Sequence, residues 1–208
     1  MAQRDFDAVI LAGGLARRLE GTDKPALEFG GTTLLDRAID ACAEAGDVVC
    51  VGPRRPTRRD VFWTREDPPG SGPVAALAAG LSITRAQYVV LLAADLPFVD
   101  AELVHSLWID SADHDGAVLT DRSGKDQWLA ACYRRSSLTE AISRQSAEHG
   151  SLDGLSLKRL LADFDLARVP DVAGQAFDCD TWEDVDHVRR LVDGGGRDHR
   201  PPRTESES

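Results

Sequence analysis

Positively charged side chains follow a pair of glycines near the start of the chain. The apolar run 7–12 (DAVILA) has the composition of a buried strand, and it ends at Gly13 and Gly14. Two glycines let the backbone turn sharply and bring N–H groups close to the oxygens of a phosphate. The cations of the loop are Arg17, Arg18 and Lys24. The loop is therefore a candidate for holding a polyphosphate, and the alternative is a glycine-rich turn with solvated arginines.

The spacing of these glycines and of the lysine argues against two common phosphate-binding motifs. The loop matches neither the G-x-x-x-x-G-K-[ST] pattern nor the G-x-G-x-x-G pattern. A P-loop kinase and a dinucleotide-dependent enzyme are therefore disfavoured.

An aspartate follows the most apolar segment of the chain. Residues 88–93 (YVVLLA) are expected to form a strand, and Asp95 and Pro97 come directly after it. Ligands of open parallel sheets bind beyond the carboxyl ends of the strands. A carboxylate at such an end can hold Mg²⁺, which in turn bridges phosphate oxygens. The alternative is that Asp95 caps the next helix or stabilises the turn at Pro97.

Apolar runs alternate with helical patterns along the chain. Besides 7–12 and 88–93, strands are expected at 47–51, 61–64, 116–120, 127–133 and 175–178. Helices are expected at 32–45, 73–83, 100–108, 138–145, 155–161 and 181–192. Continuous apolar strands separated by helices predict a mainly parallel sheet covered on both faces, which is a three-layer α/β/α sandwich.

The overall composition fits one α/β domain. The chain has 208 residues, of which 42% are apolar, and a formal net charge of −11. The negative charge argues against nucleic acid or an anionic membrane as a partner, while a local basic pocket can still bind a small anion. Residues 194–208 contain no apolar side chain. We therefore expect a domain at 1–193 and a disordered tail at 194–208.

The cysteines and the N-terminus predict a reduced, cytoplasmic protein. The four cysteines form no C-x-x-C pair, and no histidine cluster accompanies them. This pattern favours neither a disulfide framework nor a zinc site. We recognise no signal peptide and no apolar run of the ~18 residues that a membrane helix needs.

The complete glycine loop resembles the signature of the molybdopterin guanylyltransferase family and its nucleotidyltransferase relatives. The matching string is Leu11-Ala12-Gly13-Gly14, then Arg17-Arg18, then Gly21-Thr22-Asp23-Lys24, and the resemblance continues over about residues 5–192. It implies a Rossmann-like nucleotidyltransferase fold. Leu11, Ala12, Gly13 and Gly14 would then contact the base and ribose of GTP, while Arg18 and Lys24 would bind the triphosphate. The Asp-x-Pro after the apolar strand resembles the metal-binding aspartate of that family, which makes Asp95 the expected Mg²⁺ ligand.

Two further acidic positions match segments of the same family. Asp67 precedes Gly70-Ser71-Gly72, which resembles the loop that contacts the nucleobase. A carboxylate there could accept from N1–H and N2–H₂ of guanine, and the alternative is a plain connecting loop. Asp180 is a second candidate metal or substrate ligand, although the family segment usually reads Asn-x-Asn-Thr-Pro-Glu where this chain has Asp178 and Asp180. Its alternative is a helix-start residue without chemistry.

Three other features have a structural interpretation that we prefer. The loop with Arg54, Arg55, Arg58 and Arg59 is expected to be solvated and mobile, and its alternative is a landing surface for an anionic acceptor. Trp128 is expected in the core, although it could stack on a pterin. Lys158 and Arg159 are expected on the polar face of a helix.

The resemblance implies nucleotidyl transfer from GTP to the phosphate of molybdenum-bound molybdopterin, with Mg²⁺ as cofactor and pyrophosphate as product. Catalytic roles would fall to Lys24, Arg18 and Asp95. CTP as donor, a sugar phosphate or phospholactate-like acceptor, and a non-catalytic nucleotide-binding module remain alternatives. The protein is expected to be a monomer or weak oligomer that contacts pterin-handling enzymes transiently.

Overall fold

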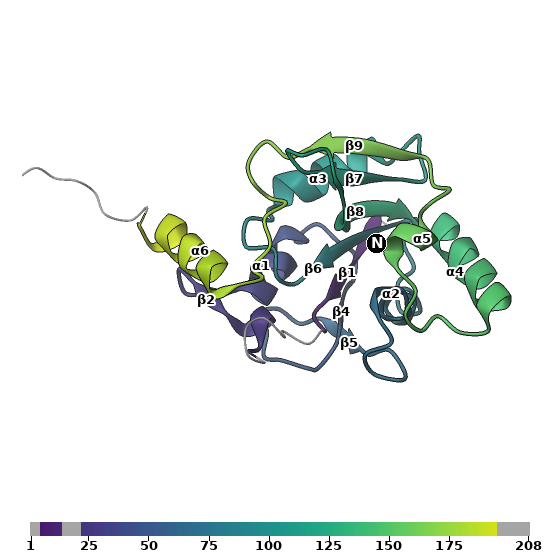
Figure 1. Cartoon of the computed structure of the whole chain (residues 1–208), viewed down its shortest axis with the longest axis horizontal. Helices are drawn as coiled ribbons and strands as arrows, with labels where there is room; N and C mark the ends of the chain where they lie inside the picture. The colour runs from purple at the N-terminus through teal and green to yellow at the C-terminus, as the bar shows by residue number, and fades with distance from the viewer. Residues whose placement is uncertain (1–4, 14–21, 195–208) are drawn as a thin grey trace, which may run out of the picture.

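A computed structural model describes residues 5–13 and 22–194, and these form one seven-stranded sheet covered by helices (Figure 1). The strand order is β5-β4-β1-β6-β8-β7-β9. The strands are β1 (Phe6–Leu11), β4 (Val48–Val51), β5 (Phe62–Thr64), β6 (Tyr88–Ala93), β7 (Gly116–Thr120), β8 (Asp126–Arg134) and β9 (Leu166–Pro170). Only β8 runs antiparallel to its neighbours in this sheet, so the predicted mainly parallel sheet is confirmed.

Helices pack on both faces of the sheet, which confirms the predicted three layers. One core cluster joins the sheet to α1 (Leu34–Ala41) and α3 (Ala101–Asp110). The other joins it to α2 (Pro73–Leu81), α4 (Arg135–His149) and α5 (Leu157–Leu160). Successive side chains of a strand point to opposite faces, so Ala8 and Ile10 enter the first cluster while Val9 enters the second. Both faces of β1 are therefore buried, as the apolar run 8–11 within it requires.

A small hairpin and the last helix form a separate packing unit. The hairpin strands are β2 (Glu28–Phe29) and β3 (Thr32–Thr33), and the helix is α6 (Trp182–Gly194). Gly30 and Gly31 connect the strands with φ angles of 58° and 73°, which a two-residue hairpin turn requires and glycine adopts readily. The third core cluster holds the hairpin against α6 through Phe29, Leu34, Cys179, Val185 and Val188.

The predicted helix at 32–45 begins later than expected because its first residues belong to this hairpin. The backbone N–H of Asp36 donates to the hydroxyl of Thr33 at 3.0 Å, so Thr33 is the N-cap of α1.

Of the predicted elements, 88–93 and 116–120 have the bounds found for β6 and β7, whereas the strand expected at 175–178 is wrong. The backbone N–H groups of Gly174 and Gln175 donate to the carboxylate of Asp171 at 2.7 and 2.8 Å. These bonds fold the segment into a turn and use donors that a strand would need. The strand that pairs with β7 at this edge is β9, which the sequence pattern did not reveal.

The four cysteines are buried and unpaired. Among the residues that the structure describes, no helix is long and apolar enough to span a membrane. The division into residues 1–193 and a tail from 194 stays a prediction. Residues 195–208 lie outside the described part of the chain.

A buried carboxylate ties the start of β1 to two neighbouring loops. Asp7 is 4% exposed. It accepts from the N–H of Asp47 at 2.9 Å on one oxygen, and from Arg85 at 2.7 Å and Ala86 at 2.9 Å on the other. Three backbone donors that the sheet leaves unused are thus satisfied by one side chain.

We expect Asp7→Ala to lower the free energy of unfolding by about 2–4 kcal/mol, because it leaves buried N–H groups without an acceptor. Chemical denaturation followed by circular dichroism measures the change. Asp5→Ala is the matched control, since the exposed Asp5 should contribute less than about 0.5 kcal/mol. Equal stability of Asp7→Ala and the control would contradict this role.

Candidate active site

The ammonium group of Lys24 lies between carboxylates from two distant parts of the chain. Its Nζ donates to Asp180 Oδ1 at 2.5 Å and lies 3.6 Å from Asp95 Oδ2. The Lys24 side chain is 15% exposed, so most of the ammonium stem is removed from water. The structure therefore brings together three residues that the sequence singled out separately.

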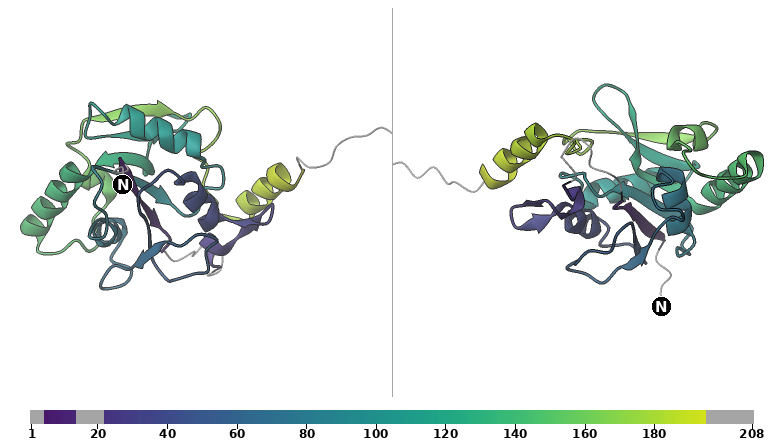
Figure 2. Two further views of the ribbon diagram at one scale, coloured as in Figure 1. Left: turned by 180° about the vertical axis from the view of Figure 1, so that it is seen from behind. Right: turned by 60° about the horizontal axis from the view of Figure 1, so that its bottom comes forward.

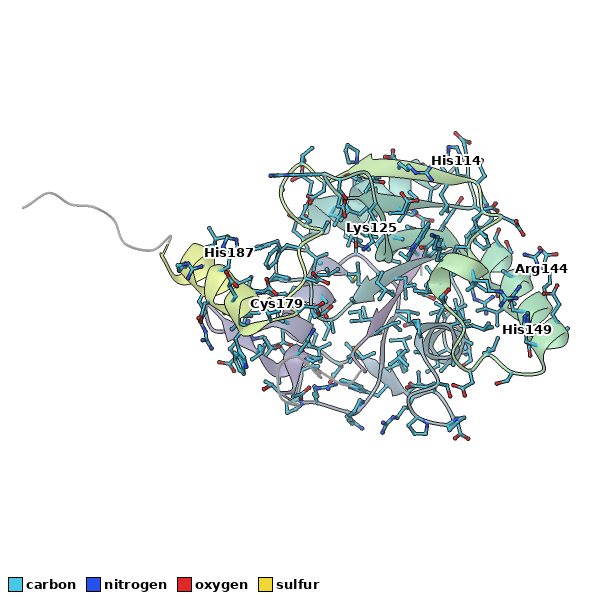
Figure 3. The ribbon with its side chains drawn as sticks, in the orientation of Figure 1. His114, Lys125, Arg144, His149, Cys179 and His187 are labelled. Carbon is cyan, nitrogen blue, oxygen red and sulfur yellow. The ribbon has the colours of Figure 1, made fainter. Side chains whose placement is uncertain are left out.

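Each of these three residues is placed by an element of the sheet or its margin. Lys24 opens the short 3₁₀ helix η2 (Lys24–Ala26), Asp95 follows β6, and Asp180 precedes α6. The N–H of Cys179 donates to the carbonyl of Asp95 at 3.2 Å, and the buried Cys179 is fixed in the third core cluster beside α6 (Figure 3). Packing of α6 thus helps to fix the position of Asp180 relative to Asp95.

The protonation behaviour of the cluster reflects burial and crowding of negative charge. Burial raises the pKa of Asp95, and the nearby carboxylates of Asp178 and Asp180 raise it further against the opposing effect of Lys24. Burial, followed by the charge of Asp180, also raises the pKa of Asp178. For Lys24, burial lowers the pKa, but the bond to Asp180 and the charges of the carboxylates outweigh it, so the pKa is raised. Lys24 is therefore a permanent cation that offsets part of the repulsion among the carboxylates.

The start of the glycine loop is hydrogen-bonded to the end of β4 and to the segment after β6. The N–H of Ala94 donates to the carbonyl of Leu11 at 3.1 Å, and the N–H of Ala12 donates to Val51 at 2.8 Å. Gly13 is exposed at the carboxyl edge of the sheet, where a ligand can reach its backbone. Gly14, Arg17, Arg18 and Gly21 lie outside the described residues, so the roles expected for Gly14 and Arg18 stay predictions.

The close approach of two loops at this edge requires a glycine that the sequence reasoning did not single out. A Cβ added to Gly52 would lie 2.7 Å from the N atom of Gly13 and 2.8 Å from the carbonyl carbon of Ala12. Gly52 also has a φ of 143°, which disfavours other residues. Glycine at position 52 therefore permits the contact between the two loops.

The arginine loop was expected to be solvated and mobile, and for two of its members the structure contradicts this. Arg55 donates to both oxygens of Asp23 and to the carbonyl of Ala12. The backbone N–H of Arg58 donates to Asp36 at 3.0 Å, and its side chain bonds the carbonyl of Gly31. These bonds fasten the loop to η2, α1 and the hairpin. These side chains are held because their acceptors lie nearby in the folded chain. The sequence pattern alone does not show where those acceptors lie.

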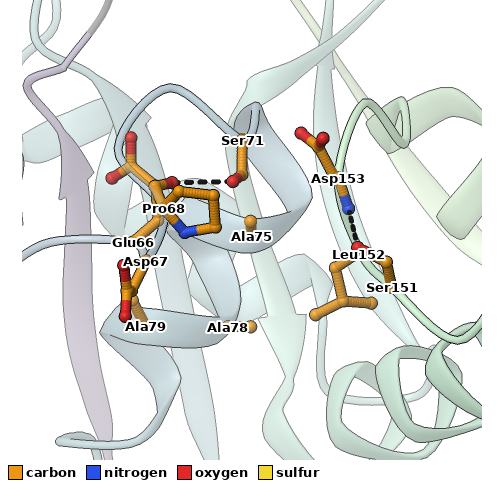
Figure 4. Close-up of a pocket in the computed structure, with 10 residues that line it drawn as sticks. All are labelled: Glu66, Asp67, Pro68, Ser71, Ala75, Ala78, Ala79, Ser151, Leu152 and Asp153. Carbon is orange, nitrogen blue, oxygen red and sulfur yellow. Dashed lines mark hydrogen bonds between the residues drawn. The ribbon is translucent and has the colours of Figure 1, made fainter.

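Asp67 lines a pocket of about 300 Å³ between α2 and the loop that follows α4. Figure 4 shows Asp67 and Asp153 on opposite sides of the pocket, with Ala75 and Ala78 of α2 between them. Ser71 is 4% exposed and donates from its hydroxyl to the carbonyl of Pro68 at 2.7 Å, which shapes the loop. Neither Lys24 nor Asp95 is among the described residues that line this pocket.

The remaining candidates, Trp128, Lys158 and Arg159, lie in the settings that the sequence predicts for them, the core and the polar face of a helix. Trp128 packs partly buried against the second core cluster, and its carbonyl accepts from the hydroxyl of Tyr133 at 3.0 Å. Lys158 and Arg159 are exposed on α5, where Arg159 donates to His149 of α4 at 2.7 Å. Helices α4 and α6 lie at opposite ends of the molecule in every view (Figures 1 and 2).

A divalent cation fits the chemistry of the site. Asp95 and Asp180 converge on one cationic atom and offer the hard oxygen ligands that Mg²⁺ or Mn²⁺ takes. Within the described ranges, no group of three histidine, cysteine, aspartate or glutamate side chains forms a ready-made metal site. Magnesium commonly binds one or two carboxylates and completes its shell with water and substrate phosphates. The two carboxylates are thus compatible with a metal that arrives with a nucleotide.

A comparison with protein families decides the class of this protein. The model of the MobA-like NTP transferase domain matches residues 8–167. The chain belongs to this family. As a nucleotidyltransferase, it is 32% identical over 164 residues to a protein of Methanosarcina acetivorans named probable molybdenum cofactor guanylyltransferase, covering 70% of this chain and 71% of the relative.

Solved structures share the fold of this nucleotidyltransferase. Molybdopterin-guanine dinucleotide biosynthesis protein A from Archaeoglobus fulgidus has a TM-score of 0.68 and 19% identity, covering 90% of this chain and 99% of that chain. A Mycobacterium tuberculosis protein solved in complex with manganese has a TM-score of 0.67 and 17% identity, covering 89% and 98%. The Rossmann-like nucleotidyltransferase fold expected from the glycine loop is confirmed.

We expect Asp95→Asn to leave the metal-free protein as stable as wild type, or more so, at pH 7. Because the folded-state pKa of Asp95 is raised, its ionisation costs stability as pH rises through that pKa. As pH falls through the same pKa, the wild-type carboxyl is protonated, and the difference in Tm between the two proteins should shrink. Turnover should nevertheless drop by about 10²-fold or more, the scale of one preorganised electrostatic contact.

Thermal melts from pH 4 to pH 7 with a chelator, together with a pyrophosphate-release assay, measure these effects. Asp110→Asn, at an exposed site on α3, should change neither. A large fall in the Tm of Asp95→Asn at pH 7 would show that the carboxylate serves the fold, and full turnover at limiting Mg²⁺ would refute its role.

Proposed function

We propose that this nucleotidyltransferase transfers GMP from GTP to the terminal phosphate of a molybdopterin acceptor and releases pyrophosphate. The observation that carries the proposal is the Lys24 ammonium held against Asp95 and Asp180 at the carboxyl edge of the sheet. Relatives named molybdenum cofactor guanylyltransferases support the donor and acceptor.

The reaction needs no protein nucleophile. The acceptor phosphate attacks the α-phosphorus in line, the bond to the β-phosphate oxygen breaks, and that oxygen leaves with its electron pair on pyrophosphate. Lys24 binds the triphosphate and neutralises charge that develops on the leaving group, which is its expected role beside Arg18. The backbone at Gly13, exposed next to β1, offers its N–H to phosphate oxygens.

A divalent cation bound by Asp95 and Asp180 would lower the negative charge of the phosphates and orient them. Mg²⁺ is the cofactor that we propose, and the manganese in the solved structure of a protein with the same fold supports a divalent metal as cofactor. The side chain of Asp95 keeps 28% of its surface exposed, which leaves it open to a ligand from solution.

The order of the strands supports a base site and a phosphate site along one edge of the sheet. Asp67 follows β5, Gly13 follows β1 and Asp95 follows β6, and the strands β5, β4, β1 and β6 are consecutive and parallel. Three strand spacings separate β5 from β6, about 14 Å. An extended nucleotide can therefore lie across these strand ends with its base toward Asp67 and its triphosphate toward Lys24.

The direct experiment is incubation of the protein with each nucleoside triphosphate and molybdenum-loaded pterin, with dinucleotide formation and pyrophosphate release as readouts. Formation of the guanine dinucleotide is the expected result. Use of CTP, or of a sugar phosphate as acceptor, would select one of the related transferases. Nucleotide binding without any turnover would select a non-catalytic module. The aspartates at 178 and 180, which replace the asparagines of the family segment, favour that alternative, whereas the intact Gly13, Gly14, Lys24 and Asp95 argue against it.

We expect Lys24→Ala to lose about 2–4 kcal/mol of transition-state stabilisation in kcat/KM, because one preorganised cation is removed from the triphosphate. Lys24→Met keeps an apolar stem but removes the charge. It should show the same loss as Lys24→Ala, which would assign the loss to the charge and not to disturbed packing. Steady-state kinetics with GTP measure the effect, and Lys158→Ala at the exposed α5 site is the control. Wild-type kcat/KM in both Lys24 variants would refute the assignment.

Guanine should be preferred over cytosine by at least ~10² in kcat/KM, which is about 2.7 kcal/mol. One carboxylate at Asp67 can accept from both N1–H and N2–H₂ of guanine, whereas cytosine presents N3 and O2 acceptors beside a single amino group. Asp67→Asn should shrink the GTP-to-CTP ratio more than it slows GTP. The exposed Asp60, in the loop before β5, supplies the control Asp60→Asn. Equal use of both nucleotides by wild type would overturn the guanine assignment and leave nucleotidyl transfer intact.

A further inference from the structure

One guanidinium group joins the two segments that carry Gly13 and Lys24. The Nε of Arg55 donates to the two carboxylate oxygens of Asp23 at 3.0 and 2.8 Å, and its Nη2 donates to Oδ1 at 2.6 Å. Its Nη1 donates to the carbonyl of Ala12 at 2.8 Å. Ala12 directly precedes Gly13, and Asp23 directly precedes Lys24.

The geometry of these bonds suits arginine specifically. A planar fork binds a carboxylate through two nitrogens and fixes its orientation, and the third nitrogen remains for the carbonyl. A lysine ammonium is a single donor centre and cannot span the same acceptors. The side chain of Arg55 is 14% exposed and that of Asp23 is 51% exposed, so the guanidinium group is largely shielded from water while the carboxylate is not. The bond from Arg55 to the carbonyl of Ala12 is the more shielded of its contacts.

The backbone that carries Arg55 is itself held at the end of β4. The N–H of Gly52 donates to the carbonyl of Thr64 in β5 at 2.9 Å, and the backbone of Gly52 lies against that of Gly13. The Nη1 of Arg55 also donates to the carbonyl of Pro53 at 2.9 Å, which folds the side chain back onto its own loop. The fork therefore projects from a point that is fixed relative to the sheet.

We propose that Arg55 is a positioning residue of the nucleotide site, which sets the Lys24 turn relative to Gly13. Its donors are engaged with Asp23 and two backbone carbonyls, so it acts through these groups and makes no contact with the triphosphate itself. Holding both phosphate contacts in place before the nucleotide arrives removes the cost of ordering them on binding. The proposed benefit for nucleotide binding rests on the function proposed above.

Two measurements on the full chain test this role, with Arg55→Met and Arg55→Lys as variants and Arg54→Met at the exposed neighbouring position as control. Amide hydrogen exchange in peptides covering residues 23–29 should accelerate in Arg55→Met, where the N–H of Ala26 and that of Leu27 close the turn. The Kd of Mg-GTP by calorimetry, without acceptor, should rise about tenfold or more, as expected for a lost charge-assisted bond. Arg55→Lys should recover only part of this loss.

The pair should also behave as one unit. Asp23→Asn should weaken Mg-GTP binding about as much as Arg55→Met, and the double variant should be little worse than either single variant. In steady-state kinetics the KM for GTP should rise more than kcat falls, while the Tm of each variant stays within a few degrees of wild type.

Unchanged exchange in residues 23–29 of Arg55→Met would overturn the inference, as would accelerated exchange with unchanged Mg-GTP affinity. A lower Tm with unaltered Kd and KM would assign Arg55 to the fold alone. Should the wild-type chain bind no nucleoside triphosphate, the proposed function would be wrong, while the exchange result would still decide whether Arg55 holds the Lys24 turn.

Discussion

The parallel alignment of β1 with β4 and β6 is the constraint on which the whole site depends. Because the three strands run in the same direction, their carboxyl ends meet at one edge, and the loops that leave them are forced into contact. Burial of both faces of β1 helps to fix its register, since a shift by one residue would exchange Ile10 and Val9 between the two cores. Because Leu11 pairs with Ala93, Gly13 and Asp95 each follow the paired ends of β1 and β6 by two residues and leave the sheet at the same edge. The glycine at 52 completes the edge by letting the loop after β4 approach the backbone of Gly13.

The proposed site at that edge needs a positive charge, whereas the whole molecule is negatively charged. A chain with a net charge of −11 must build a local cationic point to bind a triphosphate, and the half-buried Lys24 is the point that we propose. Its cost is met by carboxylates that pair with it, yet burial and mutual repulsion raise the pKa of Asp95 and Asp178. Crowded carboxylates with raised pKa values beside a cation are typical of functional sites.

Local patterns could predict the sheet and its edge but not the contacts made across long stretches of chain. The apolar runs of β6 and β7 were sufficient to set their bounds, and the run of β1 placed Gly13 at a strand end. The turn at 175–178 was misread because its apolar residues suggested a strand, whereas the carboxylate of Asp171 takes up its N–H groups. Lys24 and Asp180 are separated by 156 positions, so only the family motif pointed to both. Nothing distinguished Arg55 from its neighbouring arginines, since its acceptors are defined by folding alone.

The aspartates at 178 and 180 change how the proposed reaction must balance its charges. An amide at 180 could only share a hydrogen bond with Lys24, whereas the carboxylate forms an ion pair at 2.5 Å. When a triphosphate takes the ammonium group, Asp180 and Asp95 lose their cation and repel the incoming phosphates. A divalent cation held by the carboxylates would offset that repulsion, so we expect metal and nucleotide to favour each other's binding in this chain. In the proposed reaction, carboxylates at these positions would make the site depend more strongly on a metal than amides would, without adding any group that reacts.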